Sequence, residues 1–78
     1  MKELLLALAK GLVDDPDAVN VVVDEPDAEG ITFYHLRVAQ GDMGRVIGKQ
    51  GRIAKAIRTI MKSAAIRAGE KISVEIDE

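Results

Sequence analysis

Hydrophobic residues near the start of the chain recur three and four positions apart, which is the spacing of one side of an α-helix. The pattern predicts a helix from Lys2 to Asp15, which ends there because the residue before Pro16 avoids the helical region. The hydrophobic side of this helix is formed by Leu4, Leu5, Leu8 and Leu12.

Two short strands follow this helix. The run from Val19 to Val23 is rich in β-branched valine and too short for a helix, so it predicts a strand. Residues 24–30 have the composition of a loop, and a second strand is predicted from Ile31 to Ala39. Two strands joined by a short loop predict an antiparallel hairpin. Alternation along the second strand gives two faces, with Tyr34, Leu36 and Val38 on one and His35 and Arg37 on the other.

The longest helix is predicted over residues 52–68, after a glycine-rich stretch. Its hydrophobic and cationic side chains separate onto opposite sides when successive residues are placed about 100° apart. Gly69 follows as a C-terminal cap. The apolar arc consists of Ile53, Ile57, Ile60, Met61, Ala64 and Ala68. The basic side consists of Arg52, Lys55, Arg58 and Lys62.

The last segment, Lys71 to Asp77, alternates between apolar and polar residues and predicts a third strand. The second and third strands are joined by a long helical connection, as a parallel pair requires. We therefore predict an α+β fold in which residues 1–78 form a single domain. Its three-stranded mixed sheet should carry helices on one face only, because each strand offers one apolar face.

Charge is divided unevenly along the chain. The net charge of the 78 residues is −2, yet residues 1–34 hold two lysines against eight acidic residues, giving −6. Residues 35–71 hold nine Lys or Arg against two acidic residues, giving +7, and residues 72–78 add −3. A polyanion responds to the local field, so the middle segment is a candidate phosphate-binding surface. The alternative is an ordinary solvated face.

Composition excludes several classes of protein. The chain has no cysteine, which rules out disulfide scaffolds, thiolate zinc sites and cysteine nucleophiles. Its core must be aliphatic, because there is no Trp and only one Phe and one Tyr. The apolar run from Leu4 to Ala9 is far too short to span a membrane, and Lys10 interrupts it without a signal-peptide cleavage site. We expect a cytoplasmic protein without a membrane partner.

An enzyme is one alternative function, and the sequence argues against it. His35 is the one side chain suited to act as a base at neutral pH, and it lies on a predicted strand as a surface or edge residue. No hydroxyl residue stands in a nucleophile-elbow motif, and no phosphate-binding loop ends in Gly-Lys-Ser or Gly-Lys-Thr. We expect no catalysis, no cofactor, no metal ion and no small-molecule substrate.

The glycine-rich stretch contains the candidate chemistry. Gly48 and Gly51 lie three residues apart, a spacing that is weak by itself because Gly41 and Gly44 repeat it. In the first case an apolar pair precedes Gly48 and a basic helix follows Gly51. Glycine lets a phosphodiester backbone approach closely, and helix-terminal N–H groups and nearby cations can bind its oxygens. The alternative is a tight helix–turn–helix that needs glycine only for its backbone angles.

The run Val46-Ile47-Gly48-Lys49-Gln50-Gly51-Arg52-Ile53 resembles the signature of the KH domain, an apolar pair, a GxxG loop and an aliphatic residue. The order of elements, with an extra helix and strand before the core, resembles the type II form of that fold, αββααβ. Residues 34–38, 44–52 and 56–59, with the Val-Glu-Ile-Asp ending, are similar to the KhpA family of small bacterial KH proteins.

The resemblance implies binding of single-stranded RNA without catalysis, with the GxxG loop clamping about four nucleotides. The family resemblance further implies RNA chaperone activity, a second KH-containing partner such as KhpB, and an influence on cell elongation and envelope homeostasis. With almost no aromatic residues to stack on bases, we expect modest affinity. The implied RNA-binding residues are Gly48, Lys49, Gln50 and Gly51, with Arg45, Arg52 and Lys55 beside them. The implied structural positions, which hold two helices together, are Val46, Ile47 and Ile53.

Two further expectations concern protein partners. A protein-interaction KH module without RNA binding is the second alternative function, suggested by the acidic N-terminal segment and tail. Ile66 falls inside the basic side of the long helix. A small aliphatic domain gains stability by burying more apolar surface. We therefore expect a weak homodimer, or a heterodimer with another KH protein, through the C-terminal half of this helix, with residues 48–51 left free.

Overall fold

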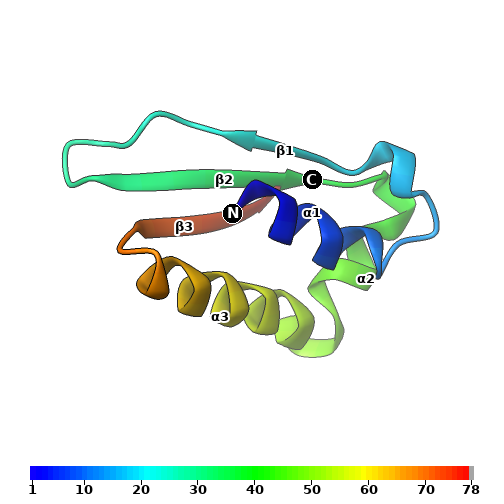
Figure 1. Cartoon of the computed structure of the whole chain (residues 1–78). Helices are drawn as coiled ribbons and strands as arrows, with labels where there is room; N and C mark the ends of the chain where they lie inside the picture. The colour runs from blue at the N-terminus through cyan, green and yellow to red at the C-terminus, as the bar shows by residue number, and fades with distance from the viewer. Residues whose placement is uncertain (78) are drawn as a thin grey trace.

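The chain folds into two layers, a three-stranded sheet and a layer of helices that covers one of its faces (Figure 1). The computed structural model describes residues 1–77, and Glu78 of the predicted acidic tail lies outside the described residues. The predicted order αββααβ is confirmed. The helices are α1 (Lys2–Lys10), α2 (Met43–Ile47) and α3 (Arg52–Arg67). The strands are β1 (Asn20–Val23), β2 (Ile31–Arg37) and β3 (Lys71–Asp77). Short 3₁₀ turns are η1 (Pro16–Ala18), η2 (Gln40–Asp42) and η3 (Lys49–Gly51).

The sheet is mixed, as predicted. β2 is its central strand, antiparallel to β1 and parallel to β3. Tyr34 and Leu36 are buried and Arg37 is exposed, which agrees with the predicted alternation. The first two strands are shorter than predicted. Val19 is not part of β1 because its N–H donates to the Pro16 carbonyl of η1, and β2 ends before the chain turns into η2.

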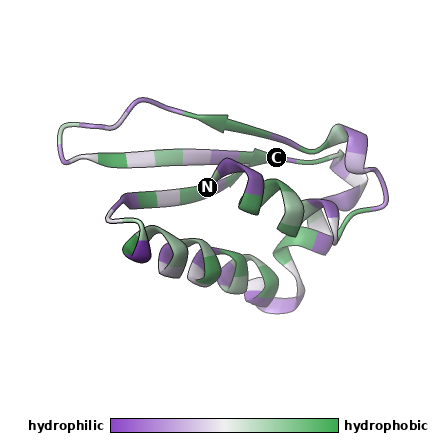
Figure 2. Cartoon of the chain, in the orientation of Figure 1, coloured by the Kyte–Doolittle hydropathy of each residue, from purple (hydrophilic) through white to green (hydrophobic). Residues whose placement is uncertain are grey.

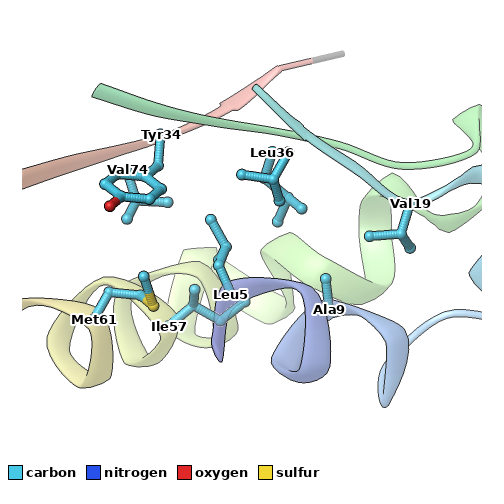
Figure 3. Packing of buried hydrophobic residues seen from close by; sticks show 9 residues of the cluster. Leu5, Ala9, Val19, Tyr34, Leu36, Ile57, Met61 and Val74 are labelled. Atoms are coloured by element: carbon cyan, nitrogen blue, oxygen red, sulfur yellow. The ribbon is translucent and has the colours of Figure 1, made fainter. Parts of the chain in front are cut away.

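The core lies between the sheet and the helices. In Figure 3, Tyr34, Leu36 and Val74 point from the sheet toward Leu5 of α1 and Met61 of α3. Burial raises the pKa of the Tyr34 phenol, and the charges of Glu70 and Glu3 raise it further. The loop between β1 and β2 and the turn before α3 are mostly hydrophilic (Figure 2). The buried cluster consists of Leu5, Ala9, Val19, Val21, Tyr34, Leu36, Ile57, Met61 and Val74.

The first helix ends earlier than predicted, at Lys10 rather than Asp15. The reason is a tertiary contact. The buried carboxylate of Asp42 accepts the N–H of Asp14 at 3.2 Å and that of Asp15 at 3.0 Å. Those N–H groups would otherwise continue the helical ladder, so the side chain of a distant residue replaces one more turn of helix.

The buried side of α3 differs from the predicted arc. It consists of Ala54, Ile57, Met61 and Ala65, while Ile60 and Ala68 are exposed. This side is turned by roughly 50° from the hydrophobic centre of the helix. Alanine permits a close approach of helix to sheet, so the small residues face β3 and Ile60 is left beside α1. The four residues of the predicted basic side are all exposed, as expected.

Candidate nucleic-acid interface

The GxxG loop, residues 48–51, joins α2 to α3 through a backbone that glycine permits. Gly48 and Gly51 have φ of 76° and 73°, and Gln50 between them has φ of 59°. A Cβ on Gly48 would lie 2.6 Å from Cγ1 of Ile53, so the aliphatic residue of the signature packs directly on the first glycine. The turn by itself explains both glycines, and phosphate binding has to be argued from the groups around it.

The N-terminus of α3 opens beside this loop. Gly51 is its N-cap, and no side chain caps the helix. The first N–H groups of a helix have no partner within it, and they carry the positive end of the helix dipole. In this 16-residue helix the N–H of Arg52 already donates to the Lys49 carbonyl of η3, so the groups that remain belong to Ile53 and Ala54. Such an arrangement suits an anionic oxygen.

Three cationic side chains of the predicted site are exposed around the loop. Within residues 1–77, the ammonium groups of Lys49 and Lys55 make no hydrogen bond or ion pair. Nη2 of Arg52 donates to Oε1 of Gln50 at 3.1 Å, which links two of the predicted RNA-binding residues. The loop therefore presents Lys49, Arg52 and Lys55 to solvent beside free backbone donors.

Arg45 is placed differently from these three. Its guanidinium lies 2.9 Å from the carboxylate of Asp14 and 3.5 Å from that of Asp42. Asp42 is only 4% exposed. Arg45 therefore joins α2 to the segment after α1, and its charge is shared with two carboxylates.

A groove lies between β3 and the middle of α3, the helix that begins at the loop, and sequence reasoning did not include it in the site. Nε of Arg58 donates to the Val74 carbonyl at 3.1 Å and crosses this groove. The sequence did indicate one wall of the groove, because Arg58 and Lys62 belong to the predicted basic side of α3. Which strand edge lies beside that side could not be read from the pattern. The groove has a volume of about 180 Å³ and is lined by Arg58, Lys62, Ile72, Ser73 and Val74.

A second hollow extends this α3–β3 groove toward the end of α3. It shares Lys62 and Ile72 with the first, and it also includes Ile31, Ala65, Ile66, Glu70 and Lys71. Ile66 is 67% exposed here. The isoleucine that the sequence assigned to a dimer interface therefore also forms the far wall of the groove.

Other expected features lie away from this surface. Nε2 of His35 is 2.7 Å from Oδ2 of Asp24, on the face of the sheet that α1, α2 and α3 leave open. Among the side chains that the structure describes, no set of three His, Asp or Glu residues is arranged to hold a metal ion. None of the helices in this part of the chain is long and apolar enough to cross a membrane.

Comparison with known proteins identifies a family. The family described as KhpA/KhpB, KH domain, matches residues 2–76. The RNA-binding protein KhpA of Clostridium acetobutylicum is 54% identical over 76 residues, which cover 97% of this chain and 99% of that protein. The KhpA proteins of Listeria monocytogenes and Chlamydia trachomatis are 49% and 46% identical over 78 residues. These 78 residues are all of this chain and 100% and 97% of the two relatives.

Two solved structures share the fold. A structure of Era from Aquifex aeolicus bound to GDP and aluminium fluoride superposes with a TM-score of 0.64 and 18% identity. A structure of Era with a nucleotide analogue and a segment of 16S ribosomal RNA gives a TM-score of 0.60 and 18% identity. Each match covers 96% of this chain but only 28% of the Era chain. At this identity the likeness concerns the fold alone.

Proposed function

Because this chain belongs to the KhpA/KhpB family of KH-domain proteins, we propose that it binds single-stranded RNA through the GxxG loop and the α3–β3 groove. Residues 1–78 act as one KH domain that holds about four nucleotides and catalyses no reaction. One observation carries the proposal: among the described residues, the start of α3 has no side-chain cap and Lys49 and Lys55 beside it make no ion pair, while Arg58 and Lys62 of the same helix line the α3–β3 groove. The shared name of the relatives, RNA-binding protein KhpA, supports the same ligand.

Phosphates are assigned to the loop end of this surface. The N–H groups at the start of α3 donate to phosphate oxygens, and Lys49 and Lys55 supply charge. Arg52 contributes from its position beside Gln50. Arg45 is a weaker contributor, because a phosphate has to compete with Asp14 and Asp42 for its guanidinium.

Bases are assigned to the groove. Its walls combine the aliphatic side chains of Ile72 and Val74 with the cationic Arg58 and Lys62. An aliphatic wall covers a base without the stacking energy of an aromatic ring, about 1–3 kcal/mol per base. Affinity for a single short strand is therefore modest, which suits the RNA chaperone role that the family resemblance adds. On the same proposal the protein acts in the bacterial cytoplasm, with a second KH protein of the KhpB kind and an influence on cell elongation and envelope homeostasis.

The loop is tested with the double variant Lys49→Asp, Gln50→Asp. Both side chains are exposed, and Asp tolerates the positive φ of position 50, so the fold should persist. Attraction for phosphate becomes repulsion, and the affinity for a single-stranded RNA should fall about tenfold or more in an anisotropy titration.

The matched control makes an equal change in net charge, but at exposed positions of α1. Lys2→Asp with Lys10→Gln also lowers the charge by three but leaves the loop intact, and it should bind RNA within about twofold of the wild type. Equal binding by the loop variant would contradict the proposal and favour the protein-interaction module without RNA binding.

We also propose a weak association of two KH domains, as a homodimer or with a KhpB-like partner, through the C-terminal half of α3. Ile66 is exposed there, at the far end of the α3–β3 groove, and contact at Ile66 leaves the GxxG loop and the Arg58 end of the groove free. Two RNA sites in one assembly gain affinity from bivalency. Sedimentation over a hundredfold concentration range should show a rising mass that Ile66→Glu abolishes, with Ala7→Glu, which makes the same charge change at an exposed position of α1, as the control. A constant monomer mass in all three proteins rules the association out.

A further inference from the structure

In the part of the chain that the structure describes, the outer edge of β1 presents backbone groups without a hydrogen-bond partner. The N–H of Asp24 donates to the carbonyl of Phe33 at 3.0 Å, so this is a hydrogen-bonded pair of the antiparallel ladder between β1 and β2. Bonded and non-bonded pairs alternate along such a ladder. Val21 and Val23 therefore direct their N–H and C=O groups away from β2. Within residues 1–77, no hydrogen bond from another segment reaches these groups.

The two edges of the sheet differ in how far other parts of the chain cover them. Both outer strands contact a helix, α1 at β1 and α3 at β3. At β3, Arg58 also donates to the carbonyl of Val74, so this edge is partly covered by a side chain. β1 is the outer strand on the other side (Figure 1), and Val22 and Val23 are 40% and 41% exposed. Among the described residues, the β1 edge has no such cover.

The surroundings of the β1 edge are acidic. Residues 11–36 contain seven carboxylates and no Lys or Arg. Three of these carboxylates are used within the fold, because Asp14 pairs with Arg45, Asp24 lies 2.7 Å from His35, and Asp27 accepts two backbone N–H groups of its own loop. Asp17 before the strand and Glu25 and Glu29 after it are exposed. The nearest cation in the strands is Arg37, which pairs in register with Asn20.

We propose that the β1 edge binds an extended, Lys- or Arg-containing segment of another protein as an added strand. The outward N–H and C=O groups of Val21 and Val23 supply the ladder, which is how an exposed edge captures a peptide. Carboxylates at both ends of the strand select cationic side chains, and the exposed valine side chains accept apolar ones. The length of β1 limits the pairing to a short segment of the partner.

Charge decides among the occupants. Pairing two copies of β1 would bring the exposed Asp17, Glu25 and Glu29 of one copy toward those of the other, and these like charges repel. A nucleic acid would meet the same repulsion. An extended basic segment is the occupant for which both the backbone and the field are complementary.

The β1 edge and the proposed RNA surface lie on opposite sides of the sheet. β2 separates β1 from β3, so the two edges are about 10 Å apart, and both can be occupied together. The chain would then join a basic protein segment to RNA. The edge proposal does not depend on RNA binding, and the two are tested by different ligands.

The test uses an eight-residue peptide of alternating Lys and Val, titrated into the ¹⁵N-labelled wild-type chain. At saturation, amide hydrogen exchange at Val21 and Val23 should slow at least about tenfold, because only an added strand hydrogen-bonds these N–H groups. A peptide of alternating Glu and Val should not bind. The Lys peptide with all backbone amides N-methylated keeps its charge but cannot pair, and should bind at least about tenfold more weakly.

Two variants test the same edge from the protein side. Val23→Pro removes one outward N–H at a position where an edge strand accepts proline, and should lose peptide binding while RNA binding persists. Val23→Thr keeps the N–H and should bind the peptide like the wild type. Unchanged exchange at Val21 and Val23, equal binding of the N-methylated peptide, or protection of both amides in the free protein by self-pairing would each overturn the proposal. The N-methylated peptide decides the matter if Val23→Pro does not fold.

Discussion

Gly48 is constrained in two ways at once. Its positive φ disfavours any residue with a side chain, and a Cβ there would overlap Ile53. Gly51 has the positive φ without a neighbour within 4 Å of a Cβ, and Gly44 has neither constraint. Three glycines of one stretch of sequence therefore have three different structural requirements.

This difference predicts a graded series of alanine variants. Gly48→Ala combines backbone strain of about 1–3 kcal/mol with a clash that Ile53 must relieve, so it should lower stability most and weaken RNA binding. Gly51→Ala pays only the strain. Gly44→Ala lies in α2 and should stabilise the helix by about 0.5–1 kcal/mol. Urea unfolding of the three variants measures the order, and equal effects at positions 44 and 48 would contradict it.

Between elements, Asp42 is the junction of three segments. From the start of α2 it accepts the N–H groups of Asp14 and Asp15 and lies 3.5 Å from Arg45. A buried carboxylate is stable in such a place only with several donors around it. These contacts end α1, and they fix the start of α2 against the segment that leads from α1 into η1.

Asp42→Asn should release this junction. The amide group keeps one acceptor but turns a donor toward N–H groups that need an acceptor, which costs about 1–3 kcal/mol. The free energy of unfolding should fall by that amount, and the amides of Asp14 and Asp15 should exchange faster than in the wild type. Asp17→Asn, at an exposed position, should change stability by less than about 0.5 kcal/mol. If both variants unfold at the same urea concentration, Asp42 does not hold these segments.

Over the whole molecule, charge is divided between two surfaces. The cations of α3 line the GxxG loop and the α3–β3 groove, whereas the carboxylates of residues 11–36 surround η1, β1 and the β1–β2 loop. A net charge of −2 therefore describes neither surface. The proposed ligands of the two surfaces, an RNA strand and a basic protein segment, have opposite charge.

The salt dependence of RNA binding reports on the basic surface. The cations available there are Lys49, Arg52, Lys55, Arg58 and Lys62. If these five contact phosphates, the logarithm of affinity should fall with the logarithm of salt concentration at a slope of about −3 to −4. Lys55→Gln should reduce the slope by about 0.7, and Arg45→Gln by less, because Asp14 and Asp42 already neutralise Arg45. A flat dependence would mean that this face is merely solvated.

Much of the architecture was predictable because local patterns and global packing agree. Alternation in β2 and β3, the β-branched run of β1 and the amphipathic pattern of α3 specified the elements, and the long connection specified the parallel pair. The GxxG motif could be located by its spacing and its family resemblance. The positive φ angles of its two glycines could also be expected from the sequence, since glycine is the residue that readily accepts a positive φ.

Tertiary contacts decided the rest. Periodicity could not foresee that Asp42 would end α1, that Arg45 would lie on two carboxylates, or that α3 would turn its alanines to the sheet and leave Ile60 exposed. It also could not predict that Arg58 would bind the edge of β3 while the edge of β1 stays open. Each of these depends on residues far apart in sequence meeting in space. A pattern of hydrophobicity specifies which side of an element is buried on average, whereas packing and hydrogen-bond competition decide which neighbour each side chain meets.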